Sequence, residues 1–176
     1  GYVEQVVLSD LGRAEEAERI LRPLLQAHIA TFGEAHARTL RLGNSLGVLL
    51  LQQRRFAEAE PVLRQNLAAS EQVYGASHIA TLNPISNLAG ALRQQGKVEE
   101  SGPYYQRAYD GFVAAFGETH PRAIQTLANL GNYQLSAGDA QGSLQSHLRA
   151  RELSNGVFAA EHPSIEETHL GAGKAY

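Results

Sequence analysis

Residues 117–131 read GETHPRAIQTLANLG, and the main features of this stretch return every 42 residues along the chain. The histidine recurs at His36, His78, His120 and His162. The glycine three places before it recurs at Gly33, Gly75 and Gly117, and Ala159 replaces it in the last copy. A fixed period of 20 to 50 residues is typical of stacked repeats rather than of one globular domain. The sequence therefore predicts an array of repeats.

Each period contains two series of apolar or small residues at helical spacing, which indicates two helices per repeat. One series includes Leu46, Leu88 and Leu130, and the other includes Ala17, Ala59, Ser101 and Ser143. Gly12, Arg54, Gly96 and Gly138 occupy a turn position between them, where glycine tolerates the positive φ that ends a helix. We expect helices over residues 2–10, 14–31, 37–53, 57–73, 80–95, 98–115, 121–137, 140–157 and 163–176, and no strands.

Pro84 has no counterpart in the other copies. Proline in a helix interior removes a hydrogen bond and costs about 3 kcal/mol. We therefore expect the third repeat's first helix to begin near Asn83 or to kink there.

The pattern resembles the tetratricopeptide repeat in its 42-residue, kinesin light chain-like form. The residues that carry the resemblance are the Gly-x-x-His-Pro step at 117–121, the Asn-Leu-Ala run at 87–89 and the Glu-Ala-Glu-Pro run at 58–61. The resemblance implies an all-α, right-handed solenoid of antiparallel helix hairpins, with about four units. The expected single array over 1–176 has a truncated repeat at about 1–35, repeats at about 36–77, 78–119 and 120–161, and a partial first helix at about 162–176.

Composition narrows the possible functions of the chain. Its 176 residues carry a formal net charge of -3 with a pI near 6.2, whereas a nucleic-acid-binding domain usually has a basic patch and a pI above about 9. No stretch approaches the roughly 20 apolar residues of a membrane span, and there is neither a signal peptide pattern nor a cysteine. We expect a soluble, cytoplasmic protein that binds neither nucleic acid nor membrane. Because methionine is absent, we also expect a piece of a longer or processed chain.

The repeated histidines raise the possibility of a metal-dependent hydrolase, since histidine is a common metal ligand and acid/base group. Equivalent residues of successive repeats lie about one repeat apart, whereas ligands of one metal converge at about 2 Å. We therefore expect these histidines to tie each inter-repeat loop to the next helix. His28, His147 and His169 form no regular ligand spacing. The prediction is a non-enzymatic protein with no catalytic residue, metal or cofactor.

The resemblance also implies that peptides bind in the concave groove lined by the first helix of each repeat. The groove candidates are Arg41, Asn44, Asn83, Asn87, Arg93, Gln94, Gln125, Asn129 and Asn132. Asparagine is a middling helix former, and its carboxamide both donates and accepts hydrogen bonds, which suits a peptide backbone. The alternative interpretation is that these are polar residues on a solvated helix face. A lysine and arginine clamp for a terminal carboxylate is not expected, because Lys97 falls at a hairpin turn.

The sequence thus predicts a protein-interaction scaffold that binds a peptide or partner domain in its groove. Two alternatives stay open beside the hydrolase. The array could regulate another domain of a larger signalling protein intramolecularly, or it could associate with itself through its ends, because end repeats of an intact array have a polar outer face.

Overall fold

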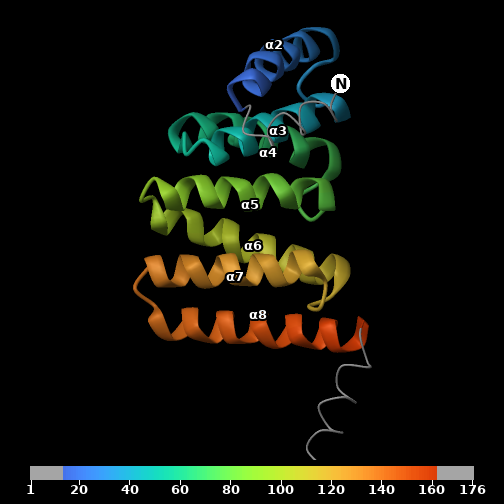
Figure 1. Cartoon of the computed structure of the whole chain (residues 1–176). Coiled ribbons are helices and arrows are strands. Elements are labelled where there is room, and N and C mark those ends of the chain that lie inside the picture. Colours follow the sequence, from blue (N-terminus) through green and yellow to red (C-terminus); the bar gives the residue numbers. More distant parts are fainter. Residues whose placement is uncertain (1–13, 162–176) are drawn as a thin grey trace, which may run out of the picture.

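The computed structural model describes residues 14–161, with side chains up to residue 156. Seven helices follow one another in this part of the chain, and no strand occurs among the described residues. They are α2 (Ala14–Phe32), α3 (Ala37–Gln52), α4 (Phe56–Tyr74), α5 (Ile79–Gln94), α6 (Val98–Phe116), α7 (Pro121–Ser136) and α8 (Ala140–Glu161). Figure 1 shows them stacked in chain order, which confirms the expected all-α solenoid. The helices expected at 2–10 and 163–176 lie outside the described residues.

Consecutive helices form hairpins that stack in two rows. We call α3, α5 and α7 the A helices and α2, α4, α6 and α8 the B helices. Each A helix packs on the B helices before and after it, and α5 also contacts both α3 and α7 directly. The A helices therefore form one continuous layer along the array. The predicted repeat boundaries, such as 78–119, remain a prediction, because helix packing alone does not define where one unit ends.

The A helices begin at the repeated histidines. His36, His78 and His120 have extended backbone angles, and each Nδ1 accepts a hydrogen bond from the backbone N–H two residues later, at 3.1–3.2 Å. A side-chain acceptor at this position satisfies one of the N–H groups that the first helical turn leaves free. The histidines are therefore helix N-caps. His162 lies outside the described residues.

The expected helix start near Asn83 was wrong, because α5 begins at Ile79 and Pro84 lies inside it. The alternative expectation, a kink at this point, stays a prediction. Proline at this position withholds one N–H from the helix, but the first turn is held in other ways. The His78 cap binds the N–H of Ala80 at 3.1 Å, and Thr81 Oγ1 donates to the carbonyl of Gly75 at 2.9 Å. Pro84 is itself buried among the apolar residues of the helix. Packing and capping together thus outweigh the loss of one hydrogen bond.

The hairpin turns depend on a residue with positive φ. Gly96 and Gly138 have φ values of 79° and 87°, as expected for glycine after a helix end. Arg54 occupies the equivalent place in the first described hairpin and has a φ of 61°, the only positive value of a non-glycine residue in the described part. A side chain with a Cβ is strained in this region. The turn geometry is therefore kept even where glycine is missing.

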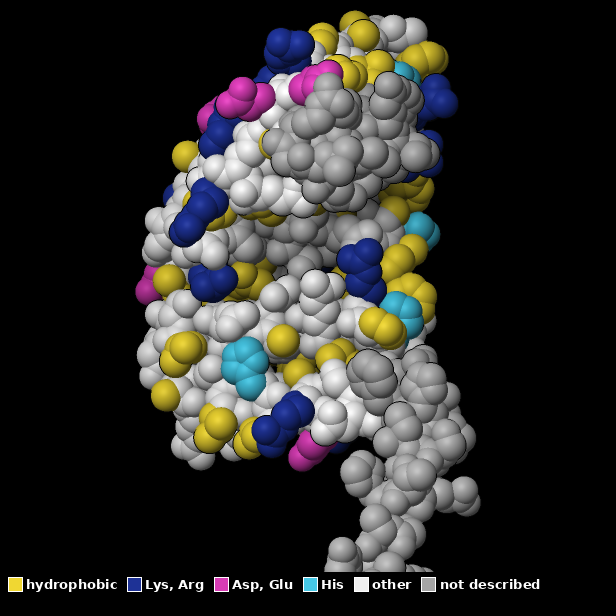
Figure 2. Space-filling view, in the orientation of Figure 1, with side chains coloured by type: hydrophobic (Ala, Val, Ile, Leu, Met, Phe, Trp, Pro, Cys, Tyr) yellow, Lys and Arg dark blue, Asp and Glu magenta, His cyan; other side chains and the backbone are white. Residues whose placement is uncertain are grey.

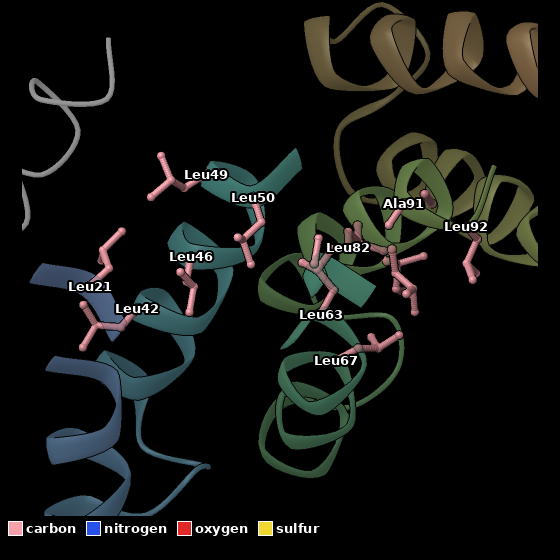
Figure 3. Packing of buried hydrophobic residues seen from close by; sticks show 14 of the residues in the cluster. Leu21, Leu42, Leu46, Leu49, Leu50, Leu63, Leu67, Leu82, Ala91 and Leu92 are labelled. Atoms are coloured by element: carbon pink, nitrogen blue, oxygen red, sulfur yellow. The ribbon is translucent and has the colours of Figure 1, made fainter. Parts of the chain in front are cut away.

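Leucine side chains fill the space between the helices, and they form two clusters. The larger cluster reaches from α2 to Ala123 of α7 and includes Leu46, Leu50, Leu63 and Leu92, all at most 2 % exposed. Figure 3 shows side chains of this cluster extending from neighbouring helices into the space between the helices. The smaller cluster joins α7 and α8 to Tyr105 and Ala89, with Leu127, Leu130, Ala150 and Leu153. Both clusters thus draw residues from α5, α6 and α7, so they overlap along the stack.

Ion pairs join the B helices along the first part of the stack. Glu18 accepts from Arg22 at 2.6 Å and from Arg55 at 2.5 Å, although Arg55 belongs to the next hairpin. Glu60, which is 42 residues later, accepts in the same way from Arg64 and from Lys97. The next equivalent position is Gly102, so this pattern stops before the α6/α7 boundary.

Candidate functional site

A groove of about 670 Å³ runs along the A layer. Its size lies within the range of about 300–1,000 Å³ that is usual for ligand pockets. Residues of three successive A helices line it, and α4 and α6 contribute a few side chains between them. The groove therefore spans three repeats, as a site for an extended ligand would.

Most of the polar side chains in the groove belong to the set expected from the sequence. Seven of the nine candidates line it: Asn44, Asn83, Asn87, Arg93, Gln94, Gln125 and Asn129. Arg41 and Asn132 are exposed on α3 and α7 and lie outside the groove. Arg41 is the equivalent of Asn83, and Asn132 is the equivalent of Gly90, so each shares the helix face of the groove but lies outside the part that forms it. The stacking thus brings carboxamides from three repeats into one surface.

Two asparagines of neighbouring repeats are directly connected. Asn87 Nδ2 on α5 donates to Asn44 Oδ1 on α3, with 3.0 Å between the two atoms. This bond fixes the orientation of both amides, because an amide oxygen can only accept. Asn87 Oδ1 and Asn44 Nδ2 are then left to accept from and donate to another molecule. Asn129, the equivalent of Asn87 in the next repeat, is half-buried and forms no side-chain hydrogen bond with any described residue.

Arg93 and Tyr105 form the polar group at the other end of α5. Arg93 Nε donates to Tyr105 Oη at 3.2 Å, and Arg93 Nη1 donates to Ser136 Oγ at 3.5 Å. Burial raises the pKa of Tyr105, and the hydrogen bond from Arg93 opposes part of this effect. The tyrosine is therefore a neutral hydroxyl at physiological pH. Its ring also stacks on Tyr133, with 5.8 Å between the centroids.

The centre of the groove is hollow because α5 carries Gly90 there. A Cβ placed on Gly90 would meet only Tyr105 Oη, at 3.9 Å. The equivalent places on α3 and α7 hold Val48 and Asn132, so the other repeats have side chains where this one has space. Gly90 was not among the expected groove residues, although the 42-residue register contains this exchange. Val48, Leu51, Phe56 and Phe112 add an apolar part to the lining.

The histidines lie away from the groove and pair with aromatic rings. Phe32 stacks on His36, Tyr74 on His78 and Phe116 on His120, with ring centroids 4.4–4.9 Å apart. Figure 2 shows imidazoles beside hydrophobic side chains at successive levels along the right-hand side of the view. The glycines of the same loops, Gly33, Gly75 and Gly117, all have φ values of 81–85°. These aromatic residues also recur every 42 residues, a signal that was present in the sequence but not used.

Neither a metal-binding cluster nor a membrane-spanning helix is found among the described residues. Within the described part of the chain, no three histidine, aspartate or glutamate side chains are grouped so that they could hold a metal ion. None of the described helices has an apolar stretch long enough to cross a bilayer.

Comparison with models of known protein families shows which family the chain belongs to. A family model described as tetratricopeptide repeat matches residues 42–96 and 79–155, and a second model with the same description matches residues 6–38. The chain belongs to the tetratricopeptide repeat family. No curated protein matches the sequence. The tetratricopeptide fold supports a protein–protein interaction scaffold in general terms.

Solved structures of similar tetratricopeptide arrays agree with the 42-residue, kinesin light chain-like form. BtubC (BKLC) from P. vanneervenii has a TM-score of 0.75 at 20 % identity, over 87 % of this chain and 61 % of that one. Nearly identical TPR-like repeats ascribed to a kinesin light chain of Podosopora anserina give 0.79 at 19 % identity, over 91 % and 76 %. A variant of the same Podosopora protein with one residue substituted gives 0.80 at the same identity and coverage. The chain thus spans about three fifths of the length of BtubC, and at these identities the likeness shows the fold.

Proposed function

We propose that this tetratricopeptide array is a non-enzymatic scaffold whose groove binds an extended peptide segment of a partner protein. The observation that carries the proposal is the row of carboxamides from α3, α5 and α7 in one groove. A carboxamide offers two donors and an acceptor, so such a row matches the alternating C=O and N–H groups of an extended backbone. The groove thus supplies binding groups at repeated intervals.

Two asparagines are the main hydrogen-bonding groups in this proposal. Asn87 is held by Asn44, so binding a peptide costs little additional side-chain ordering there. Asn129 stands in the equivalent place one repeat later, and its side-chain carboxamide forms no hydrogen bond with any described residue. A peptide that reaches from α5 to α7 would bind both carboxamides. Gly90 leaves space between them for a side chain of the peptide.

The experiment selects binding peptides from a displayed random-peptide library and then measures their dissociation constants for purified variants. Asn87→Ala combined with Asn129→Ala removes both carboxamides, and Asn155→Ala on the exposed surface of α8 is the control. A lost hydrogen bond is worth about 0.5–1.5 kcal/mol, so the double variant is expected to weaken binding about tenfold. Asn155→Ala should leave it unchanged.

A second variant tests the groove by occlusion. Gly90→Trp places a large ring in the hollow without a clash at its Cβ, and Gly156→Trp adds the same ring to α8, where no atom lies within 4 Å of the new Cβ. Circular dichroism should show both variants to be as helical as the parent. The selected peptide should lose binding to Gly90→Trp and keep binding to Gly156→Trp. Equal binding to both tryptophan variants would contradict the proposed site.

A further inference from the structure

A second, much smaller cavity lies between α2, α3 and α4, away from the residues that line the groove. Leu25 and Ile29 of α2, Leu40 of α3 and Val62 of α4 form apolar walls. Thr39 and Asn66 also line it, and both side chains are almost completely buried, at 3 % and 6 % exposure. The cavity is therefore an apolar space with two polar side chains in it.

Each of the two polar side chains has an atom without a partner. Asn66 Nδ2 donates to the carbonyl oxygen of Leu40 at 2.7 Å, which leaves Oδ1 as the free end of the amide. Asn66 Oδ1 and Thr39 Oγ1 form no hydrogen bond with any described residue. In the next repeat the equivalent Thr81 is satisfied, because it donates to the carbonyl of Gly75. Buried polar atoms are normally bonded to protein or to ordered water, so the pair at Thr39 and Asn66 indicates a missing partner.

The space and its surroundings fit one water molecule. The cavity offers about 20 Å³ to a water, and a single water needs about 10–15 Å³ of such space. Gln65 and Glu34 also line it and are bonded to each other, with 2.7 Å from Nε2 to Oε1. A buried water typically has two to four polar partners, and this cavity supplies at least two.

The cavity exists because two residues of this repeat differ together from those of the later repeats. Gly43 replaces the large residues Ile85 and Leu127, and Asn66 replaces the small residues Ala108 and Ala150. A Cβ on Gly43 would lie 2.6 Å from Asn66 Nδ2. The glycine thus makes room for the asparagine side chain. Where the later repeats have a large apolar residue against an alanine, this repeat has a space beside a polar side chain.

We propose that this cavity binds one ordered water molecule, which accepts a hydrogen bond from Thr39 Oγ1 and donates one to Asn66 Oδ1. The water is a structural component of the second repeat alone. The water accepts the hydrogen bond from Thr39 that the equivalent Thr81 donates to the carbonyl of Gly75. It also donates to the buried amide oxygen of Asn66, a group that is absent in the later repeats because alanine stands there.

The test is a nuclear Overhauser experiment between water and the backbone amides that surround the cavity, together with a crystal structure at about 1.5 Å. The parent should show long-lived water contacts at the amides of Gly43 and Asn66, and electron density within hydrogen-bond distance of Thr39 Oγ1 and Asn66 Oδ1. The double variant Gly43→Ile with Asn66→Ala installs the pair of the third repeat. It should lose these contacts and fold at least as stably as the parent.

A second variant, Thr39→Val, keeps the shape of the side chain but removes its hydroxyl. Thr39→Val should weaken or abolish the water contacts while the circular dichroism spectrum stays unchanged. This variant keeps the proposal testable if the double variant does not fold. An empty cavity in the parent, with Thr39 Oγ1 turned to donate to the carbonyl of Gly33, would overturn the proposal. Water contacts that persist in both variants would overturn it as well.

Discussion

Lys97 Nζ lies 2.7 Å from Glu60 Oε2, so the turn before α6 is tied to the first part of α4. Gln95 Nε2 donates to the same oxygen at 2.8 Å, and Arg64 Nη2 lies 2.9 Å from Oε1. Burial acts to raise the pKa of Glu60, but these three donors outweigh it and lower the pKa to about 2. One carboxylate therefore connects two hairpins.

The first prediction concerns the pH dependence that follows from Glu60. A carboxyl whose pKa is 4.5 in the unfolded chain and about 2 in the folded one stabilises the fold above pH 4.5, and this contribution is lost as the pH falls toward 2. Its partners are about 40 % exposed, so we expect Glu60→Gln to lower the free energy of unfolding by about 1 kcal/mol at pH 7. At pH 2, where about half of the folded molecules still carry an ionised Glu60, most of the difference should be lost.

Urea unfolding followed by circular dichroism at pH 7, 4 and 2 measures this effect. Glu99→Gln is the matched control, because Glu99 is exposed at the start of α6 and has no contact with this cluster. If Glu60→Gln lost the same amount of stability at all three pH values, the stabilisation would not come from the ionised carboxylate of Glu60.

The second prediction concerns the strained turn at Arg54. Its φ of 61° costs a residue with a Cβ about 1 kcal/mol relative to glycine. Arg54→Gly should therefore raise the free energy of unfolding by about this amount, and Gly96→Arg in the equivalent turn should lower it. Thermal and urea unfolding check both changes. If Gly96→Arg were neutral, positive φ would not be what selects glycine here.

These turns also show why so much of the fold could be predicted. A 42-residue period assigns one conformation to all equivalent residues, so the turn at Arg54 follows from Gly96 and Gly138. Helix bounds follow in the same way, since α3 was expected at 37–53 and is found at Ala37–Gln52. Pro84 occurs in one copy only, and its effect depends on a cap and on packing that the period does not describe.

The site was less predictable because it depends on how repeats lie against each other. The bond between Asn87 and Asn44 joins residues 43 apart, which are not equivalent positions. Periodicity alone could not indicate that pair. Arg41 and Asn132 are the equivalents of the groove residues Asn83 and Gly90, yet both lie outside the groove. The repeat register thus indicates which helix face forms the groove, but not where the groove ends.

The third prediction concerns the histidine caps. His78→Ala removes the acceptor for the N–H of Ala80 and the ring that stacks on Tyr74, whose centroids are 4.9 Å apart with 17° between the planes. Loss of an N-cap typically costs about 1 kcal/mol, and urea unfolding should show a destabilisation of this size. His78→Asn keeps an acceptor and should recover most of the loss. If asparagine were as unstable as alanine, the stacking rather than the cap would be the main contribution.

The last prediction concerns the smaller core cluster, which joins α7 and α8 to Tyr105 and Ala89. The ion-pair clusters at Glu18 and Glu60 have no counterpart in the next repeat, because Gly102 stands at the equivalent position. The place beside Gly102 is taken by the ring of Tyr133, and a Cβ on Gly102 would lie 2.6 Å from its Cζ. That ring stacks on Tyr105 and is part of the contact between α6 and α7.

A repeat array can open in units, and the free energy of opening each unit depends on its own packing and on its contact with its neighbours. The cluster that holds α7 and α8 is the smaller of the two. We therefore expect native-state hydrogen exchange to show α7 and α8 opening together, at a lower free energy than α3 to α5. Tyr133→Ala should lower the protection of α7 and α8 while that of α3 and α4 stays unchanged. Leu50→Ala, in the larger cluster, is the control and should lower the protection of α3 and α4 instead. A single free energy of opening from α3 to α8 would show that the two clusters act as one core.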